Sequence, residues 1–187
     1  MRKSRLYILG LVTLVLFPLI GITIIGFVED NPWAYEIPFQ LGWHFQTIIG
    51  LVFGVLAGFL AWRMIRLPFM TPVRAKYGVL IHQLGLSTFD IFFISFCAGV
   101  GEELLFRGAL QTYLGIWPTA IFFVAIHGYL NPMDWRISVY GILMTLIIAI
   151  LGYFTADFGI LTSIVAHFAI DVVLLFYLTK SNPDETD

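Results

Sequence analysis

Six ionisable side chains lie inside long apolar segments of this 187-residue chain. They are Glu102, Glu103, Arg107, His127, His167 and Asp171. An ionisable group near the centre of a bilayer costs about 2.5–3.5 kcal/mol on insertion scales, so such groups are rare there and face one another. Carboxylates and imidazoles together can hold a water molecule and remove a proton from it. The set therefore predicts a site for hydrolysis, provided that separate helices bring its members together.

The spacing of these residues predicts different roles for neighbouring groups. Glu103 and Arg107 are four residues apart, on one face of a helix, and are predicted to form a structural ion pair. Glu102 points about 100° away from Glu103 around the same helix, so it can face a cavity instead. Taken singly, the Glu103–Arg107 pair is more often structural than catalytic, and a lone histidine within a span is as often a packed residue as a catalytic one. The joint pattern is what favours catalysis.

The chemistry of these groups suggests how hydrolysis would proceed. Glu102, in a poorly hydrated site beside His127, can act as a general base on water. His167 can donate a hydrogen bond to the oxyanion that develops in the substrate. Asp171, four residues after His167, either orients that imidazole or, when protonated, donates a second hydrogen bond. The predicted catalytic set is therefore Glu102, His127, His167 and Asp171.

The composition shows which solvent this chain needs. Hydrophobic residues make up 59% of it and charged residues 12%, whereas roughly 25% of the residues in soluble domains are charged. The mean hydropathy is +0.91. Such a chain cannot cover a water-facing surface with charge, so lipid is its predicted solvent. No basic patch suggests a nucleic-acid partner. The single cysteine, Cys97, excludes a disulfide within the chain.

Apolar segments predict an all-α fold, a polytopic transmembrane helix bundle of about six spans. The segments are 6–28, 41–62, 89–113, 116–129, 137–154 and 160–179. The fourth is short, because crossing the hydrocarbon layer takes about 20 helical residues. We expect one integral membrane domain, 1–187, with a polar tail at 181–187. The polar site is predicted to be enclosed by spans three, four and six.

The basic residues of the loops predict the orientation of the spans. Lys and Arg occur before span one, between spans two and three, between spans four and five, and after span six, but not in the alternate loops. The positive-inside rule then places both termini in the cytoplasm, and we expect the plasma membrane of a prokaryote. At 1.5 Å per residue, Glu102, His127 and Asp171 fall roughly 16 Å below the outer surface, and His167 roughly 10 Å.

Span two carries a stripe of small residues, Gly50, Gly54 and Gly58. Glycines four residues apart let two transmembrane helices approach closely. We predict that the stripe packs within the chain; a dimer interface is the alternative.

Three motifs occur in order at the candidate site. Residues 101–108 fit E-E-x-x-x-R, residues 123–127 fit F-x-x-x-H, and residues 167–171 fit H-x-x-x-N or D. Over roughly 89–179 the chain resembles the CAAX protease and bacteriocin-processing group (CPBP, or ABI). This group of intramembrane glutamyl proteases includes the type II CAAX prenyl endopeptidases.

The resemblance implies a catalytic core at 89–179, built of transmembrane helices around a water-filled cavity. It implies hydrolysis of a peptide bond by water activated at Glu102 with His127, and oxyanion stabilisation by His167 and residue 171. The prenyl endopeptidases have Asn where this chain has Asp171, so we assign Asp171 to holding His167 as imidazolium. The group was long labelled as metalloproteases. No cofactor is predicted, and zinc held by Glu102, His127 and His167 is the minority alternative.

These patterns together predict an intramembrane endopeptidase. Its partners would be the lipid bilayer and a membrane-associated peptide or lipidated protein substrate. Two alternatives stay open: a non-catalytic bacteriocin immunity or scaffold protein, and a proton-coupled transporter that uses the acidic groups and imidazoles as a relay. Paired halves with broken helices, which would favour the transporter, are not seen in the sequence.

Overall fold

A computed structural model of the chain describes residues 3–29 and 41–180. Those residues form helices joined by short connections and contain no strand, which confirms the predicted all-α class. The predicted polar tail, 181–187, lies outside the described residues.

Four helices are long and apolar enough to cross a membrane. They are α1 (Lys3–Val28), α2 (Trp43–Ile65), α7 (Trp135–Phe158) and α8 (Ile160–Lys180). Their length and composition make the chain an integral membrane protein.

The other two predicted spans are helical, but their helices are not both long and apolar enough to cross a membrane. The segment predicted at 89–113 consists of α4 (Thr88–Leu105), a π-helical turn η2 (Phe106–Leu110) and α5 (Gln111–Leu114), and α4 carries three acidic residues. The segment predicted at 116–129 is α6 (Ile116–Ile126), only 11 residues long. The number of six spans therefore stays a prediction.

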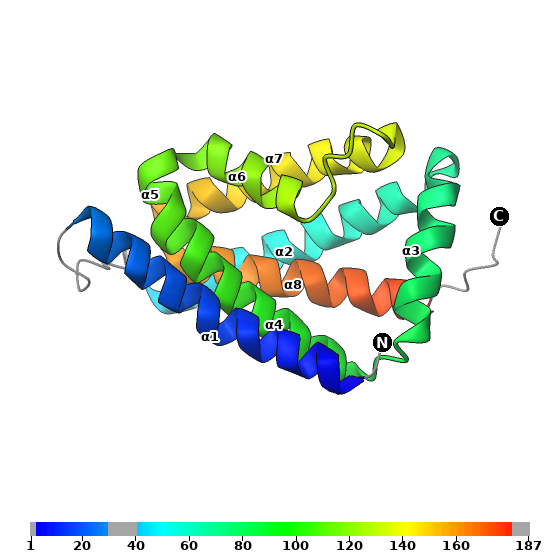
Figure 1. Ribbon diagram of the computed structural model, residues 1–187, viewed down its shortest axis with the longest axis horizontal. Helices are drawn as coiled ribbons and strands as arrows, with labels where there is room; N and C mark the ends of the chain where they lie inside the picture. The colour runs from blue at the N-terminus through cyan, green and yellow to red at the C-terminus, as the bar shows by residue number, and fades with distance from the viewer. Residues whose placement is uncertain (1–2, 30–40, 181–187) are drawn as a thin grey trace.

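The helices form a bundle whose long axes run broadly in one direction (Figure 1). α1 lies along α4, α8 packs between α2 and α4, and α6 lies on α7. A short 3-10 turn, η1 (Pro68–Met70), leads into α3 (Thr71–Gln83), which lies across one end of the bundle. The start of α1 and the end of α8 lie at this same end.

A buried carboxylate ties α1 to the beginning of α4. Asp90 caps its own helix through a capping box with Ser87, in which each residue's side chain binds the other's backbone N–H. Lys3 donates to the same carboxylate at 2.8 Å, and the Tyr7 hydroxyl donates to it as well. The start of α1 is thereby held against α4 by charge as well as by packing.

The glycine stripe of α2 lies against α8, so its predicted packing within the chain is confirmed. A Cβ atom on Gly50 would lie 2.5 Å from the carbonyl oxygen of Thr162, and one on Gly54 would overlap that of Ala166. These glycines let the backbones of α2 and α8 touch.

Replacing Gly54 by Ala is expected to destabilise the fold by about 1–3 kcal/mol, because the added methyl group forces α2 away from α8. Thermal unfolding in detergent, followed by circular dichroism, measures the effect. Gly78→Ala in α3 is the matched control, since a Cβ atom there meets nothing within 4 Å. Equal stability of the two variants would contradict the packing argument.

Candidate active site

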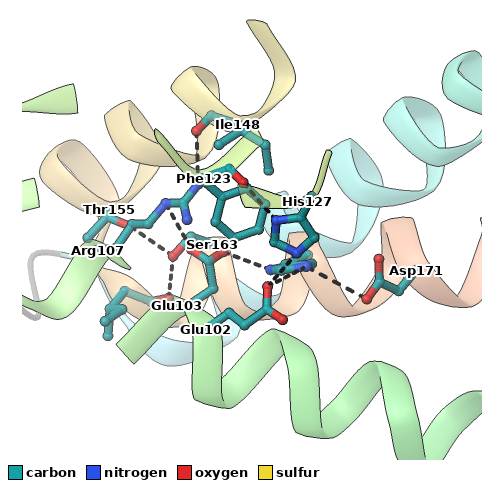
Figure 2. Close-up of polar contacts among 11 residues, drawn as sticks. Glu102, Glu103, Arg107, Phe123, His127, Ile148, Thr155, Ser163 and Asp171 are labelled. Carbon is teal, nitrogen blue, oxygen red and sulfur yellow. Dashed lines mark hydrogen bonds and ion pairs between the residues drawn. The ribbon is translucent and has the colours of Figure 1, made fainter. Parts of the chain in front are cut away.

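The structure brings all six candidate site residues together (Figure 2). Glu102 and Glu103 lie in the last turn of α4, and Arg107 follows in the π-helical turn η2. His127 comes directly after α6, while His167 and Asp171 lie on α8. Three separate segments therefore converge on one small region, as the sequence analysis requires.

Glu102 lies between the two imidazole rings. Its Oε2 atom is 3.5 Å from Nε2 of His127 and 4.0 Å from Nε2 of His167. This oxygen is buried and has no hydrogen-bond partner among the described residues. A buried carboxylate oxygen needs a partner to offset the loss of water, so it is available to a bound water molecule.

His127 is held with one nitrogen facing Glu102. The glycine after it, Gly128, has a φ of 77° and ends α6. Nδ1 of His127 lies 2.7 Å from the carbonyl oxygen of Phe123 and donates to it, since a carbonyl can only accept. The imidazole stacks on the ring of Phe123, with centroids 4.4 Å apart. Nε2 of His127 is therefore available to interact with Glu102.

The short length of α6 leaves His127, at its end, within reach of Glu102. Its 11 residues rise about 16 Å, roughly half the 30 Å thickness of the hydrocarbon layer. The chain then continues without helical structure until α7 begins at Trp135, whose ring stacks on Phe69 beside α3. Non-helical backbone within a bilayer is tolerated where it is buried in protein or lines a cavity, and Tyr129 of this segment lines the cavity beside the cluster.

His167 is anchored by Glu103. Nδ1 of His167 lies 2.8 Å from Oε1 of Glu103, whose Oε2 lies 3.1 Å from Nε of Arg107. Arg107 also donates to the carbonyl oxygen of Ile148 at 3.2 Å. The side chains of Glu103 and Arg107 are almost completely buried, so this pair is a desolvated ionic group that fixes the imidazole.

Asp171 contacts His167 less closely than the sequence analysis expects. Its Oδ2 atom lies 3.7 Å from Nε2 of His167, beyond hydrogen-bond distance. The residue that hydrogen-bonds this imidazole is Glu103, which the sequence predicts only as the ion-pair partner of Arg107. Asp171 remains a nearby negative charge with its side chain 29% exposed to the cavity.

A cavity of about 350 Å³ adjoins this cluster. Glu102, His127, His167 and Asp171 form part of its wall. Most of the remaining wall is apolar and comes from the end of α2, from α3, and from α7 and α8. Apolar clefts of this size with a few convergent polar groups are typical of substrate sites.

The prediction of no cofactor, with zinc held by Glu102, His127 and His167 as the minority alternative, stays a prediction. Ligands of one tetrahedral zinc ion lie about 2.0–2.2 Å from the metal and so about 3.3–3.6 Å from one another. The pairs that include Glu102 are 3.5 and 4.0 Å apart. In the part of the chain that the structure describes, no three His, Cys, Asp or Glu side chains are arranged to hold a metal ion. The reaction proposed below uses only the protein's own side chains.

Sequence reasoning missed two residues of the cavity wall, Tyr129 and Tyr140. Tyrosines near helix ends are common in membrane proteins because the phenol suits the interface, so neither residue stood out. The glycine that follows His127 was the available signal, because it turns the chain and brings Tyr129 back over the site.

Comparison with known proteins supports the family resemblance. Residues 84–173 match the family model described as type II CAAX prenyl endopeptidase Rce1-like. That range contains all six candidate site residues. The resemblance that the three motifs predict is therefore confirmed over this part of the chain.

Comparison with a curated relative and with solved structures supports the family resemblance less strongly than the family model does. The chain is 31% identical over 84 residues to the uncharacterized protein YpbD of Bacillus subtilis (strain 168). That alignment covers 44% of this chain and 42% of the relative, so the chain spans less than half the length of the protein it matches. No solved structure matches the chain.

Proposed function

From the match of residues 84–173 to the type II CAAX prenyl endopeptidase family, we propose that this chain is an intramembrane endopeptidase. It hydrolyses a peptide bond of a membrane-associated or lipidated substrate by means of water activated at Glu102. The observation that carries the proposal is the Oε2 atom of Glu102, which has no hydrogen-bond partner among the described residues and lies 3.5 and 4.0 Å from two imidazoles beside a largely apolar cavity.

In the proposed reaction, Glu102 and Nε2 of His127 hold the water molecule. His127 can accept from water at Nε2 because its Nδ1 donates to the carbonyl of Phe123. Glu102 takes one proton as the water oxygen attacks the carbonyl carbon of the scissile bond. The C–N bond then breaks, and Glu102 returns the proton to the departing amine.

His167 stabilises the oxyanion in this proposal. Its Nδ1 donates to Glu103, so the ring carries a second proton at Nε2 only as imidazolium. Around it stand three carboxylates, Glu102, Glu103 and Asp171, and Arg107 balances only one of them. A positive ring is compatible with this surplus of negative charge. Asp171 contributes charge to the imidazolium, and the Nε2–H donates to the oxyanion.

The apolar wall suggests the class of substrate. A cavity of about 350 Å³ that is lined mainly by aliphatic and aromatic side chains matches an apolar peptide or a lipid-modified one. Since α2, α7 and α8, which line the cavity, are long and apolar enough to cross a membrane, we expect the substrate to enter from the bilayer or its surface.

A cleavage assay tests the function. The full chain in detergent micelles is mixed with an internally quenched peptide that ends in a prenylated CAAX sequence, and mass spectrometry locates the cut. We expect a fluorescence increase and one cleaved peptide bond. Proton flux through proteoliposomes without cleavage would favour the transporter, and the absence of both activities would favour an immunity or scaffold protein.

Chelation is expected to leave the cleavage rate unchanged within about twofold, because the proposed base is a carboxylate and the oxyanion donor an imidazolium. The rate is measured after dialysis against EDTA and again with 1,10-phenanthroline, with a zinc protease treated in parallel to show that chelation worked. Loss of activity that added zinc restores would overturn the metal-free mechanism.

A further inference from the structure

One wall of the cavity carries a buried tyrosine that has no role in the reaction described above. Tyr140, on α7, is 6% exposed and lines the cavity. Among the described residues, none forms a hydrogen bond with its hydroxyl. A phenol hydroxyl that has no protein partner and lies at the wall of a cavity can be satisfied only by a molecule in that cavity, so Tyr140 is available to hydrogen-bond a ligand there.

Tyr129 places a second phenol ring against the first. The rings of Tyr129 and Tyr140 meet edge to face with centroids 5.3 Å apart, and both residues line the cavity. Gly141 makes this arrangement possible, because a Cβ atom there would overlap the carbonyl oxygen of Tyr129. The ring of Tyr129 also lies nearly parallel to that of His127, with centroids 6.1 Å apart. The pair therefore adjoins the candidate site.

A peptide in this cavity needs hydrogen-bond donors. An extended backbone carries one N–H and one C=O at most residues, and both must find partners away from water. Ionised Glu102 and Asp171 can accept from N–H groups but cannot satisfy a carbonyl oxygen. The two imidazoles are engaged by the reaction in the proposed function. The phenols of Tyr129 and Tyr140 are donors on the same wall.

We propose that the hydroxyls of Tyr129 and Tyr140 form a binding subsite for backbone carbonyl oxygens of the substrate next to the scissile bond. The subsite rests on the proposed function, since it assumes that the cavity receives a peptide. Tyr140 is the principal donor because it is the more deeply buried of the two.

Tyr140→Phe tests the subsite, because it removes the hydroxyl and keeps the ring. One hydrogen bond is worth about 0.5–1.5 kcal/mol, so KM for the quenched prenylated peptide should rise roughly three- to tenfold with kcat within about twofold. Tyr129→Phe should act in the same direction. Tyr153→Phe, on the exposed side of the same helix, is the matched control and should leave KM unchanged. An unchanged KM in Tyr140→Phe would overturn the subsite.

The unfolding temperature of Tyr140→Phe distinguishes a substrate-binding role of the hydroxyl from a structural role. If the hydroxyl has no partner in the empty protein, Tyr140→Phe should unfold at the same temperature as the parent or at a higher one. A lower unfolding temperature would show that the hydroxyl stabilises the fold and would contradict the proposal.

A binding measurement separates failure of the subsite from failure of the proposed function. Glu102→Gln is mixed with the same peptide carrying a fluorescent label and no quencher, and anisotropy gives Kd. Adding Tyr140→Phe to this variant should raise Kd roughly three- to tenfold. Binding with this rise, but without cleavage by the parent protein, would retain the subsite and reject the protease. An equal Kd, or no binding to either variant, would reject the subsite.

Discussion

Glu102→Gln is expected to reduce peptide cleavage by roughly 10²–10⁴-fold, the contribution typical of a general base. Glutamine has nearly the same shape and can still contact a water molecule, but it cannot take a proton from it. The side chain is 13% exposed and its Oε2 has no hydrogen-bond partner among the described residues, so the change should cost little in folding. Initial rates with the quenched prenylated peptide measure the loss.

Two comparisons make this result specific to Glu102. Glu29→Gln carries the same chemical change at an exposed position and should cleave at the parental rate. Circular dichroism and gel filtration in detergent should give the same profiles for both variants and the parent. Turnover near the parental level in Glu102→Gln would remove the carboxylate from the mechanism.

Glu103→Gln is expected to destabilise the protein by about 3–5 kcal/mol, as breaking one side of a buried ion pair does. Arg107 would be left as a buried cation, with its side chain 1% exposed and its carboxylate partner gone. The same change weakens the anchor of His167, so activity should fall as well. Unfolding by denaturant in mixed micelles gives the difference in free energy.

The double variant Glu103→Gln/Arg107→Met distinguishes the effect of an unpaired buried charge from the effect of a changed side-chain shape. Removing both charges leaves no uncompensated ion, so the double variant should be more stable than Glu103→Gln alone. The free energy of coupling between the two changes follows from the cycle of four proteins. Additive effects would show that the two side chains do not act as a pair, contrary to their separation of 3.1 Å.

Much of the fold follows from the sequence because the membrane restricts the secondary structure that an apolar segment can adopt. Apolar runs of about 20 residues must become helices, since no water is present to satisfy the backbone. The predicted segments 6–28 and 160–179 agree closely with α1 and α8. The fourth segment agrees less well, because apolar residues continue past the point at which Gly128 ends α6.

The sequence alone determined which residues gather at the site. Ionisable groups in hydrocarbon must face one another, and helical periodicity gives their depth and their direction around each helix. These constraints identify Glu102, His127 and His167 as neighbours without coordinates. They leave open which carboxylate holds which ring, since helices can rotate and shift against one another by an ångström or two without changing any periodicity.

Only the tertiary structure decided those pairings. α8 can approach α4 because Gly99 has no side chain: a Cβ atom there would lie 3.1 Å from the carbonyl oxygen of Ile164. At that approach His167 lies 2.8 Å from Glu103 and 3.7 Å from Asp171. A difference of this size separates a hydrogen bond from a longer-range charge contact. It arises from the packing of two helices distant in sequence, which no local pattern records.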